Sequence, residues 1–488
     1  MFESGDFREK RYILAVDVGT TTIKICLYDS QCRLVSYRTE SIDVQIKGDC
    51  ESGILCETGR EAREIAGMGI SCQRNTFISW DKEECKKWNT SWSLKILNFI
   101  GYALHKMTRS SRYMAARIFS FLNAMVTLRF LVTLVENKRM QELLHQGKLA
   151  FGCLDTWLIY KFTCCSGIIS EPSNASSTGL FDPYTMNWGY RLLQFISFPT
   201  SVLPRLSFSA GVPLGVADKK LFGFPITVAA AAGDQQSALF ASGCWMKGDV
   251  LISLGTGSFL DISTGALPHS SLNGLYPLVG WKFPNWLNFA AEGCAQNTVT
   301  VLEWAKSVGL FQDVEVTSKI AENCCTSGLY FIPAFFGIQT PVNDDTACCG
   351  LLGIRPDTTK EQMVRAVLES IAFRVYQIWK TVLMEIDTSC TSFIRCCGGV
   401  SANDFICQTI STLIGLPLQR LSRPSFASAR GVAMMAGITC GLWSRNDMQD
   451  LIEIEKIFLP EDRNRLDLIK NYERWHSAMQ RCLNFYAS

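Results

Sequence analysis

The apolar positions along the chain predict short strands alternating with helices. Tyr12–Val16 is an apolar run of strand length, and a second run, Ile23–Tyr28, follows after a turn that contains Gly19 and three threonines. Two such runs joined by a glycine-bearing turn predict a β-hairpin. The threonines place hydroxyl and backbone N–H groups around the turn, which suits an anion.

The same order of elements returns in the second half of the chain. Asp249–Leu254 predicts a strand, Gly255–Gly257 a tight turn and Ser258–Ile262 another strand. A repeated design of this kind predicts two halves with similar folds. We therefore expect an N-terminal domain over residues 11–245 and a C-terminal domain over residues 246–485, with a cleft between them that holds a nucleotide.

Further segments extend the α/β pattern. Val228–Ala232 predicts a strand of small residues, and Asp234 stands at its carboxyl end, where open α/β sheets place their chemistry. The second half then predicts a helix over Met363–Leu383, a strand over Phe393–Cys397, a glycine turn, a helix from Asp404 and a small-residue helix over Gly431–Gly437.

Two segments of the N-terminal half are less clear. Residues 42–69 show little periodicity, so no element is assigned there. Residues 94–135 are apolar at helical spacing, and two core helices are favoured over a membrane-surface helix because the basic residues are scattered around the helix.

Composition excludes several classes of protein. The 488 residues include 47 Lys and Arg against 45 Asp and Glu, so the charge does not favour binding to nucleic acid. No apolar stretch reaches the roughly 18 residues of a membrane span, and the N-terminus does not resemble a secretory signal. We expect a cytoplasmic protein without stable membrane insertion. The 21 Cys contain no Cys-x-x-Cys pair, which favours reduced, buried thiols over a zinc site.

Several motifs together resemble a known family. The chain is similar, over nearly its whole length, to the two-domain carbohydrate kinases that include glycerol kinase, and Ser176–Pro183 is similar to a divergent animal branch of them. The resemblance implies an α/β fold of two actin-like, hexokinase-like (ribonuclease H-like) domains with a nucleotide cleft between them. The segments that carry it are Asp17–Thr22, Ser71–Thr76, Phe151–Leu158, Ser173–Ser176, Gly233–Ala238, Gly255–Gly257, Phe331–Phe335 and Leu368–Phe373.

The resemblance also implies an activity. It implies that the protein phosphorylates glycerol to sn-glycerol 3-phosphate with ATP, and that Asp234 is the general base that takes the proton of the substrate hydroxyl. A helix-capping Asp is the alternative interpretation of Asp234, but it leaves the two glutamines that follow unexplained. Asp17 is the implied ligand of Mg²⁺, through water.

Binding residues follow from the same resemblance. The implied contacts to the ATP phosphates come from Thr20, Thr21, Thr22, Lys24, Gly255 and Thr256. The residues that flank the adenine are Gly398, Gly399 and Asn403. The polyol contacts come from Arg74, Asn75, Asp234 and Gln235. The expected partners are therefore ATP and a small polyol, and a homodimer is left open.

The chain departs from the family pattern at several positions. Asn75 stands where the family has Glu, Lys24 where it often has Arg, and Cys397 where an Asp usually precedes the glycine turn. Asn75 removes a charged acceptor for substrate hydroxyls. Two alternatives therefore stay open: a kinase for another small sugar or polyol, and a catalytically weak member of the fold that acts as a binding or regulatory protein.

Overall fold

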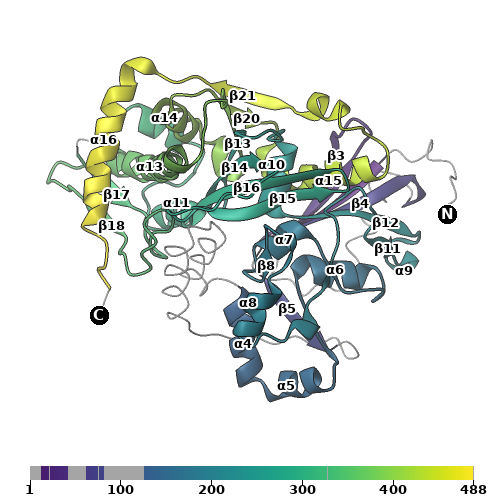
Figure 1. Ribbon diagram of the computed structural model, residues 1–488. Coiled ribbons are helices and arrows are strands. Elements are labelled where there is room, and N and C mark those ends of the chain that lie inside the picture. Colours follow the sequence, from purple (N-terminus) through teal and green to yellow (C-terminus); the bar gives the residue numbers. More distant parts are fainter. Residues whose placement is uncertain are drawn as a thin grey trace.

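Two mixed β-sheets, one from each half of the chain, organise the computed structural model (Figure 1). The structure describes residues 12–20, 22–41, 62–74, 76–81, 126–326 and 328–486. Thr21, Asn75 and most of the predicted helical segment 94–135 lie outside these residues.

The strands of the first sheet lie in the order β11-β12-β4-β1-β2-β3, and those of the second in the order β15-β16-β14-β13-β19-β20-β21. The first set is β1 (Tyr12–Val18), β2 (Thr22–Tyr28), β3 (Leu34–Ser41), β4 (Ile65–Cys72), β11 (Gly215–Ala217) and β12 (Ile226–Gly233). The second set is β13 (Val250–Leu254), β14 (Ser258–Gly265), β15 (Tyr276–Phe283), β16 (Trp286–Ala295), β19 (Ile394–Cys397), β20 (Leu418–Leu421) and β21 (Ile454–Phe458).

The two sheets repeat one topology. In the first, β1 pairs antiparallel with β2 and parallel with β4, and β4 pairs parallel with β12. In the second, β13 pairs antiparallel with β14 and parallel with β19, and β19 pairs parallel with β20. The predicted internal repeat and both predicted hairpins are therefore confirmed. Strand β1 extends to Val18, so Asp17 lies within the strand and not in the turn.

Strand β4 is the main element that the sequence pattern did not reveal. All eight of its residues are buried, yet Gly67 and Gly69 interrupt its apolar run. A Cβ atom on Gly69 would collide with the backbone of Val432, and one on Gly67 would collide with the Cys440 sulfur. The glycines are present because a helix from the other half of the chain lies directly against this strand.

An insertion between β4 and β12 projects from the first sheet (Figure 1). It has its own aromatic core, in which Phe130 contacts Phe77, Phe151 and Phe198. Its strands are β5 (Phe77–Asp81), β6 (Leu149–Cys153), β7 (Ile169–Ser170), β8 (Phe181–Asp182), β9 (Asn187–Trp188) and β10 (Arg205–Leu206). Its helices are α4 (Val126–Glu136), α5 (Lys138–His145), α6 (Leu154–Phe162), α7 (Pro172–Ser176), α8 (Tyr190–Phe195) and α9 (Lys219–Phe222).

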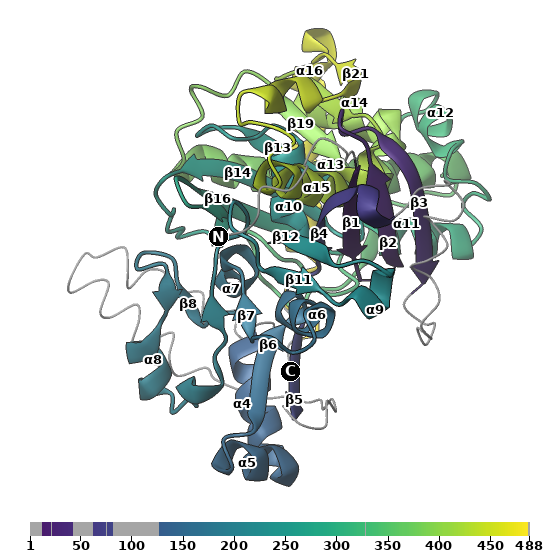
Figure 2. The same cartoon turned by 90° about the vertical axis from the view of Figure 1, so that its right-hand side faces the viewer.

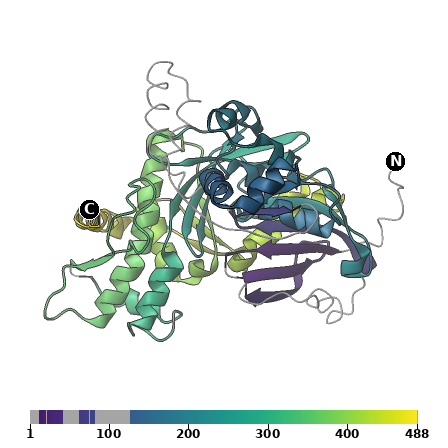
Figure 3. The same cartoon turned by 90° about the horizontal axis from the view of Figure 1, so that it is seen from below.

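Helices of the second half gather at one end of the molecule, and strands β1 to β3 lie at the other (Figure 3). The longest of these helices, α13, has a capping box formed by Thr359 and Gln362 and includes the predicted helix Met363–Leu383. The set is α11 (Thr298–Ser307), α12 (Thr317–Glu322), α13 (Lys360–Glu385), α14 (Asp404–Ile414) and α16 (Asp462–Gln480), with the antiparallel pair β17 (Tyr330–Ile332) and β18 (Gly350–Leu352). Helix α15 (Ala427–Thr439) lies apart from this set.

Two helices lie between the sheets and join the halves (Figure 2). Helix α15 belongs to the second half but packs on β1, β4 and β12 of the first sheet, and α10 (Asp234–Ala241) packs on α15 and contacts β13, β14 and β15. Their shared core contains Ile13, Phe240, Leu251 and Met434. The two halves therefore bury apolar surface against each other and not only within themselves.

The contact between α10 and α15 depends on Gly431. A Cβ atom at this position would collide with the backbone carbonyl of Ser237. We expect Gly431→Ala to lower the free energy of unfolding by about 2 kcal/mol, because the overpacking cost outweighs the better helix propensity of alanine. Denaturant unfolding measures the change.

Gly167→Ala is the matched control. The nearest atom to a Cβ at Gly167 lies 3.8 Å away, which is an ordinary contact. We expect this variant to unfold within about 1 kcal/mol of the wild type. Equal stability of the two variants would show that α10 and α15 can separate at no cost.

Candidate active site

The two predicted glycine and threonine turns occupy equivalent places in the two sheets. Gly19 N–H donates to the Thr22 carbonyl at 2.9 Å, and Gly255 N–H donates to the Gly257 carbonyl at 2.9 Å. Thr20 and Thr256 are exposed at the tips of these turns. Each sheet therefore presents a short turn with accessible hydroxyl and backbone groups, as an anion site requires.

Asp234 begins α10 directly after β12. Its Oδ1 accepts a hydrogen bond from its neighbour Gln235 N–H at 2.8 Å and lies 3.6 Å from Arg74 Nε. The Asp234 side chain is 25% exposed, so it is accessible to a ligand. Burial raises the pKa of this carboxyl and the Arg74 guanidinium opposes the rise.

Arg74 connects the two halves of the chain at this point. It follows β4 in the first sheet, and its Nη2 donates to Glu292 Oε2 on β16 of the second sheet at 2.6 Å. Its guanidinium also lies 5.8 Å from the ring centre of Phe259 on β14. An arginine held between two carboxylates and an aromatic face has a defined orientation.

Glu292 and Asp261 belong to the site but escaped the sequence analysis. They lie opposite each other in the pairing of β14 with β16, and both are buried. Burial and the neighbouring Glu292 raise the pKa of Asp261 well above its ordinary value, and Arg74 opposes the rise. The available signal was that Asp261 and Glu292 are the single charged residues of their largely buried strands.

Asp17 has the surroundings of a cation ligand. It is buried, and its Oδ1 has no hydrogen-bond partner among the described residues. Burial raises its pKa to about 6, Lys24 opposes this rise and Asp234 adds to it. A bound cation would supply the missing partner and hold the carboxyl ionised.

Lys24 lies directly across from Asp17 in the hairpin pairing. Its Nζ donates to the Ser425 carbonyl at 2.7 Å, in the segment that precedes α15. Lys24 therefore already joins the first hairpin to the second half of the chain, and its contact with a phosphate stays a prediction.

Three side-chain amide atoms that follow Asp234 lack hydrogen-bond partners within the described structure. Gln235 Oε1, Gln236 Oε1 and Gln236 Nε2 are all buried and unpaired there. Buried amides are normally satisfied, so these groups favour a polar ligand beside Asp234.

The predicted adenine residues have structural roles in the fold. Gly398 has a φ of 93°, and a Cβ atom there would collide with the backbone of Leu254. Asn403 caps α14 by accepting from Ile406 N–H at 3.1 Å, and its amide donates to Thr317 at 2.9 Å. Asn403 thus has a capping role at the start of α14. Gly399 has no such constraint, and a nucleotide contact at any of the three stays a prediction.

A buried polar layer supports the strand that carries Asp234. Ser173 Oγ accepts from Gly233 N–H at 2.8 Å, and Glu171 Oε2 accepts from Ser173 N–H at 2.8 Å. Asp155 continues the network, because its Oδ2 accepts from Glu171 N–H at 3.1 Å. This network links the insertion to the residue directly before the candidate base.

Family models match both halves of the chain. The model described as the N-terminal domain of the FGGY family of carbohydrate kinases matches residues 12–241, and that of the C-terminal domain matches residues 250–440. The chain belongs to the FGGY family of carbohydrate kinases. The resemblance stated from its motifs is thus confirmed, and this FGGY protein is an ATP-dependent carbohydrate kinase.

Curated relatives agree with the family. Glycerol kinase 5 of Bos taurus is 36% identical to this FGGY kinase, and the match covers 99% of this chain and 98% of that protein. Glycerol kinase of Listeria monocytogenes serotype 4a (strain HCC23) is 32% identical, with 97% and 99% covered. The likeness to the animal branch is therefore confirmed.

Solved structures confirm the predicted fold class. Plasmodium falciparum glycerol kinase with ADP matches with a TM-score of 0.79 and 23% identity, and the match covers 97% of this chain and 98% of that one. Ligand-bound xylulose kinase from Lactobacillus acidophilus matches with a TM-score of 0.78 and 17% identity, with 96% and 98% covered. Among the described residues of this FGGY kinase, no helix is long and apolar enough to cross a membrane.

Asp155 makes the stability of this FGGY kinase depend on pH. Burial and the nearby Glu171 raise the pKa of Asp155 from 3.8 to about 7. As the pH rises, the carboxyl therefore loses its proton in the unfolded chain before it does so in the folded chain. The contribution of Asp155 to the free energy of unfolding is fully present below about pH 4 and is lost as the pH rises through 7. Between these two pH values the wild type loses roughly 1.4 kcal/mol of unfolding free energy per pH unit through Asp155. We expect Asp155→Asn, which has no proton to lose, to be free of this decrease.

Unfolding free energies at pH 5 and pH 8 measure the effect. The variant should gain stability relative to the wild type between the two pH values. Asp467→Asn, at an exposed position on α16, is the control and should show no such gain. Parallel pH profiles for wild type and Asp155→Asn would contradict the prediction.

Proposed function

We propose that this FGGY kinase transfers the γ-phosphoryl group of ATP to a primary hydroxyl of glycerol, with Asp234 as the general base. The observation that carries the proposal is the pairing of Asp234 with Arg74, beside the unpaired Gln235 amide oxygen and the unpaired Gln236 amide. A polyol needs several convergent hydrogen bonds as well as a base, and this cluster offers both.

The proposed step forms one bond and breaks another. The substrate oxygen bonds to the γ-phosphorus as the bond from that phosphorus to the bridging β–γ oxygen breaks, and ADP leaves. Asp234 takes the hydroxyl proton. Its raised pKa makes it a stronger acceptor than an exposed carboxylate, while Arg74 favours the ionised form that a base requires.

Glu292 and Asp261 are proposed to position the substrate-binding group. Glu292 accepts from Arg74, which favours the ionised form of Glu292, and Asp261 lies opposite Glu292 in the pairing of β14 with β16. Arg74 is thereby held where it reaches both Asp234 and a substrate hydroxyl. The glycerol contacts are assigned to Arg74, Asn75, Asp234 and Gln235.

Nucleotide and metal contacts come from both halves in this proposal. Asp17 is assigned to Mg²⁺, and its unpaired, buried oxygen supports that role. Mg²⁺ prefers carboxylate, water and phosphate oxygens and neutralises phosphate charge when bound. The described residues include no cluster of three His, Cys, Asp or Glu, so Asp17 needs phosphate oxygens and water beside it to complete the site. The phosphates are assigned to Thr20, Thr21, Thr22, Lys24, Gly255 and Thr256.

A second candidate substrate is another small sugar or polyol, such as a pentulose. Asn75 favours it, because the neutral amide replaces a carboxylate that would accept from a glycerol hydroxyl. The domain limits at residues 245 and 246 and the cytoplasmic location are also proposals, and a homodimer is left open.

Asp234→Asn tests the general base. The substitution keeps the size of the side chain but removes its basicity, so we expect turnover to fall by about 10²–10⁴-fold. Binding of ATP should stay within a few-fold of the wild type, because the phosphate contacts are elsewhere. Coupled ADP release and calorimetric ATP titration measure the two effects.

Asp218→Asn is the matched control, since Asp218 caps the short helix α9 by accepting from Lys220 N–H. Asparagine caps a helix as well as aspartate, so turnover should not change. Undiminished turnover in Asp234→Asn would rule out the base assignment.

A substrate panel tests glycerol. With Mg-ATP, the wild type should release ADP fastest with glycerol, compared with dihydroxyacetone, ribulose, xylulose and gluconate. A preference for another compound would assign that substrate instead. If no compound supports turnover while ATP still binds, the panel would favour a binding or regulatory role over catalysis.

A further inference from the structure

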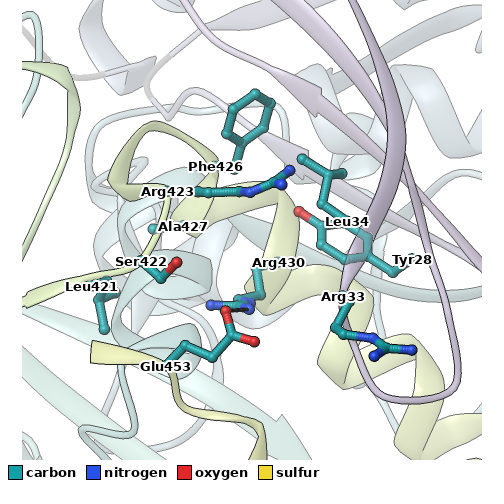
Figure 4. A pocket seen from close by; sticks show the side chains of 10 residues that line it. All are labelled: Tyr28, Arg33, Leu34, Leu421, Ser422, Arg423, Phe426, Ala427, Arg430 and Glu453. Carbon is teal, nitrogen blue, oxygen red and sulfur yellow. Dashed lines mark hydrogen bonds and ion pairs between the residues drawn. The ribbon is translucent and has the colours of Figure 1, made fainter. Parts of the chain in front are cut away.

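A cavity of about 260 Å³ lies between the β2–β3 hairpin and the start of α15 (Figure 4). Tyr28, Arg33 and Leu34 line it from the first half of the chain, and Arg423 and Arg430 line it from the second. The cavity thus lies at a junction of the two halves, and none of the sites assigned above includes these residues. Its size suits a small ligand rather than a nucleotide.

The walls carry an excess of positive charge. Arg33, Arg423 and Arg430 contribute three guanidinium groups, while Glu453 is the carboxylate among the lining residues. Arg430 pairs with Glu453 at 2.9 Å and Arg33 pairs with Asp29 at 2.9 Å. Within the described part of the chain, the Arg423 side chain has no ion pair, so one cation stays uncompensated.

Tyr28 provides an independent sign of a missing ligand. The residue is 1% exposed, and its hydroxyl has no hydrogen-bond partner among the described residues. Figure 4 shows this hydroxyl and the Arg423 guanidinium pointing into the same part of the cavity. Burial raises the pKa of Tyr28, so the hydroxyl keeps its proton and can donate it to an anion.

The start of helix α15 adds a third source of positive potential. The helix has 13 residues, and Phe426 before it provides no side-chain cap. Ala427, the first helical residue, lines the cavity. Uncapped N–H groups and the helix dipole favour an anion at this position.

The cavity is lined by other residues than those assigned to the proposed phosphate-transfer centre, and Asp17 acts on Tyr28 only as the smallest of its electrostatic influences. Tyr28 and Thr22 are at opposite ends of β2, which at about 3.3 Å per residue places them roughly 20 Å apart. Segment 423–427 lies between the transfer centre and the cavity. On one side Lys24 donates to the Ser425 carbonyl, and on the other side Arg423 lines the cavity.

We propose that this cavity binds the phosphate group of a small metabolite, through Arg423, Tyr28 and the start of α15. Arginine and a neutral hydroxyl donate to phosphate oxygens, and Leu34 and Leu421 offer apolar surface to the rest of the ligand. The ligand joins the β2–β3 hairpin to α15. The site does not depend on which sugar the kinase phosphorylates.

The site is tested by calorimetric titration of inorganic phosphate into full-length protein that is saturated with ADP. We expect the wild type to bind phosphate, Arg423→Gln to bind it about tenfold more weakly and Tyr28→Phe about threefold to tenfold more weakly. Arg191→Gln, at an exposed position on α8, is the control and should bind as the wild type does. Matching thermal unfolding midpoints establish that the variants are folded.

Two outcomes would overturn the site. The first is that the wild type binds no phosphate. The second is that wild type, Arg423→Gln and Tyr28→Phe bind phosphate equally well, while Thr256→Ala does not bind it. That result would place the ion in the transfer centre beside ADP. Because turnover is not measured, failure of this site is distinct from failure of the glycerol kinase proposal.

Discussion

The packing of α15 against β4 and α10 is the contact on which the rest of the structure depends. It requires glycine at Gly69 and Gly431, where any side chain would collide with backbone. Because α15 comes from the second half and β4 from the first, this contact brings the two sheets together. The helix also reaches the start of α10, since Ser428 Oγ donates to the Asp234 carbonyl at 3.0 Å.

Charge placement in the site follows from this junction. Desolvation alone would keep the buried carboxyls neutral, and Arg74 opposes that effect for Asp234 and Glu292 together. Asp234 and Glu292 come from different sheets, so one guanidinium serves both only when the halves are assembled. A separation of the halves would leave buried charges without partners, which costs several kcal/mol.

Local pattern was sufficient for some elements and insufficient for others. The two hairpins were predictable because strand-length apolar runs flank glycine turns, and these signals lie within a few neighbouring residues. Strand β4 was not predictable, because Gly69 is required by Val432 and Gly67 by Cys440, and both contacts are far away in the chain. The same limit applies to Asp261 and Glu292, whose proximity arises from the pairing of β14 with β16.

The sequence by itself determined the α/β class, the internal repeat, the family and the position of Asp234 at a strand end, because short-range periodicity and ordered motifs carry these properties. Only the tertiary structure decided which groups surround that residue. It showed Lys24 bonded to Ser425, Asn403 bonded to Thr317 and the basic cavity beside Tyr28. Each of these depends on residues distant in sequence, and their approach is decided by packing between the halves.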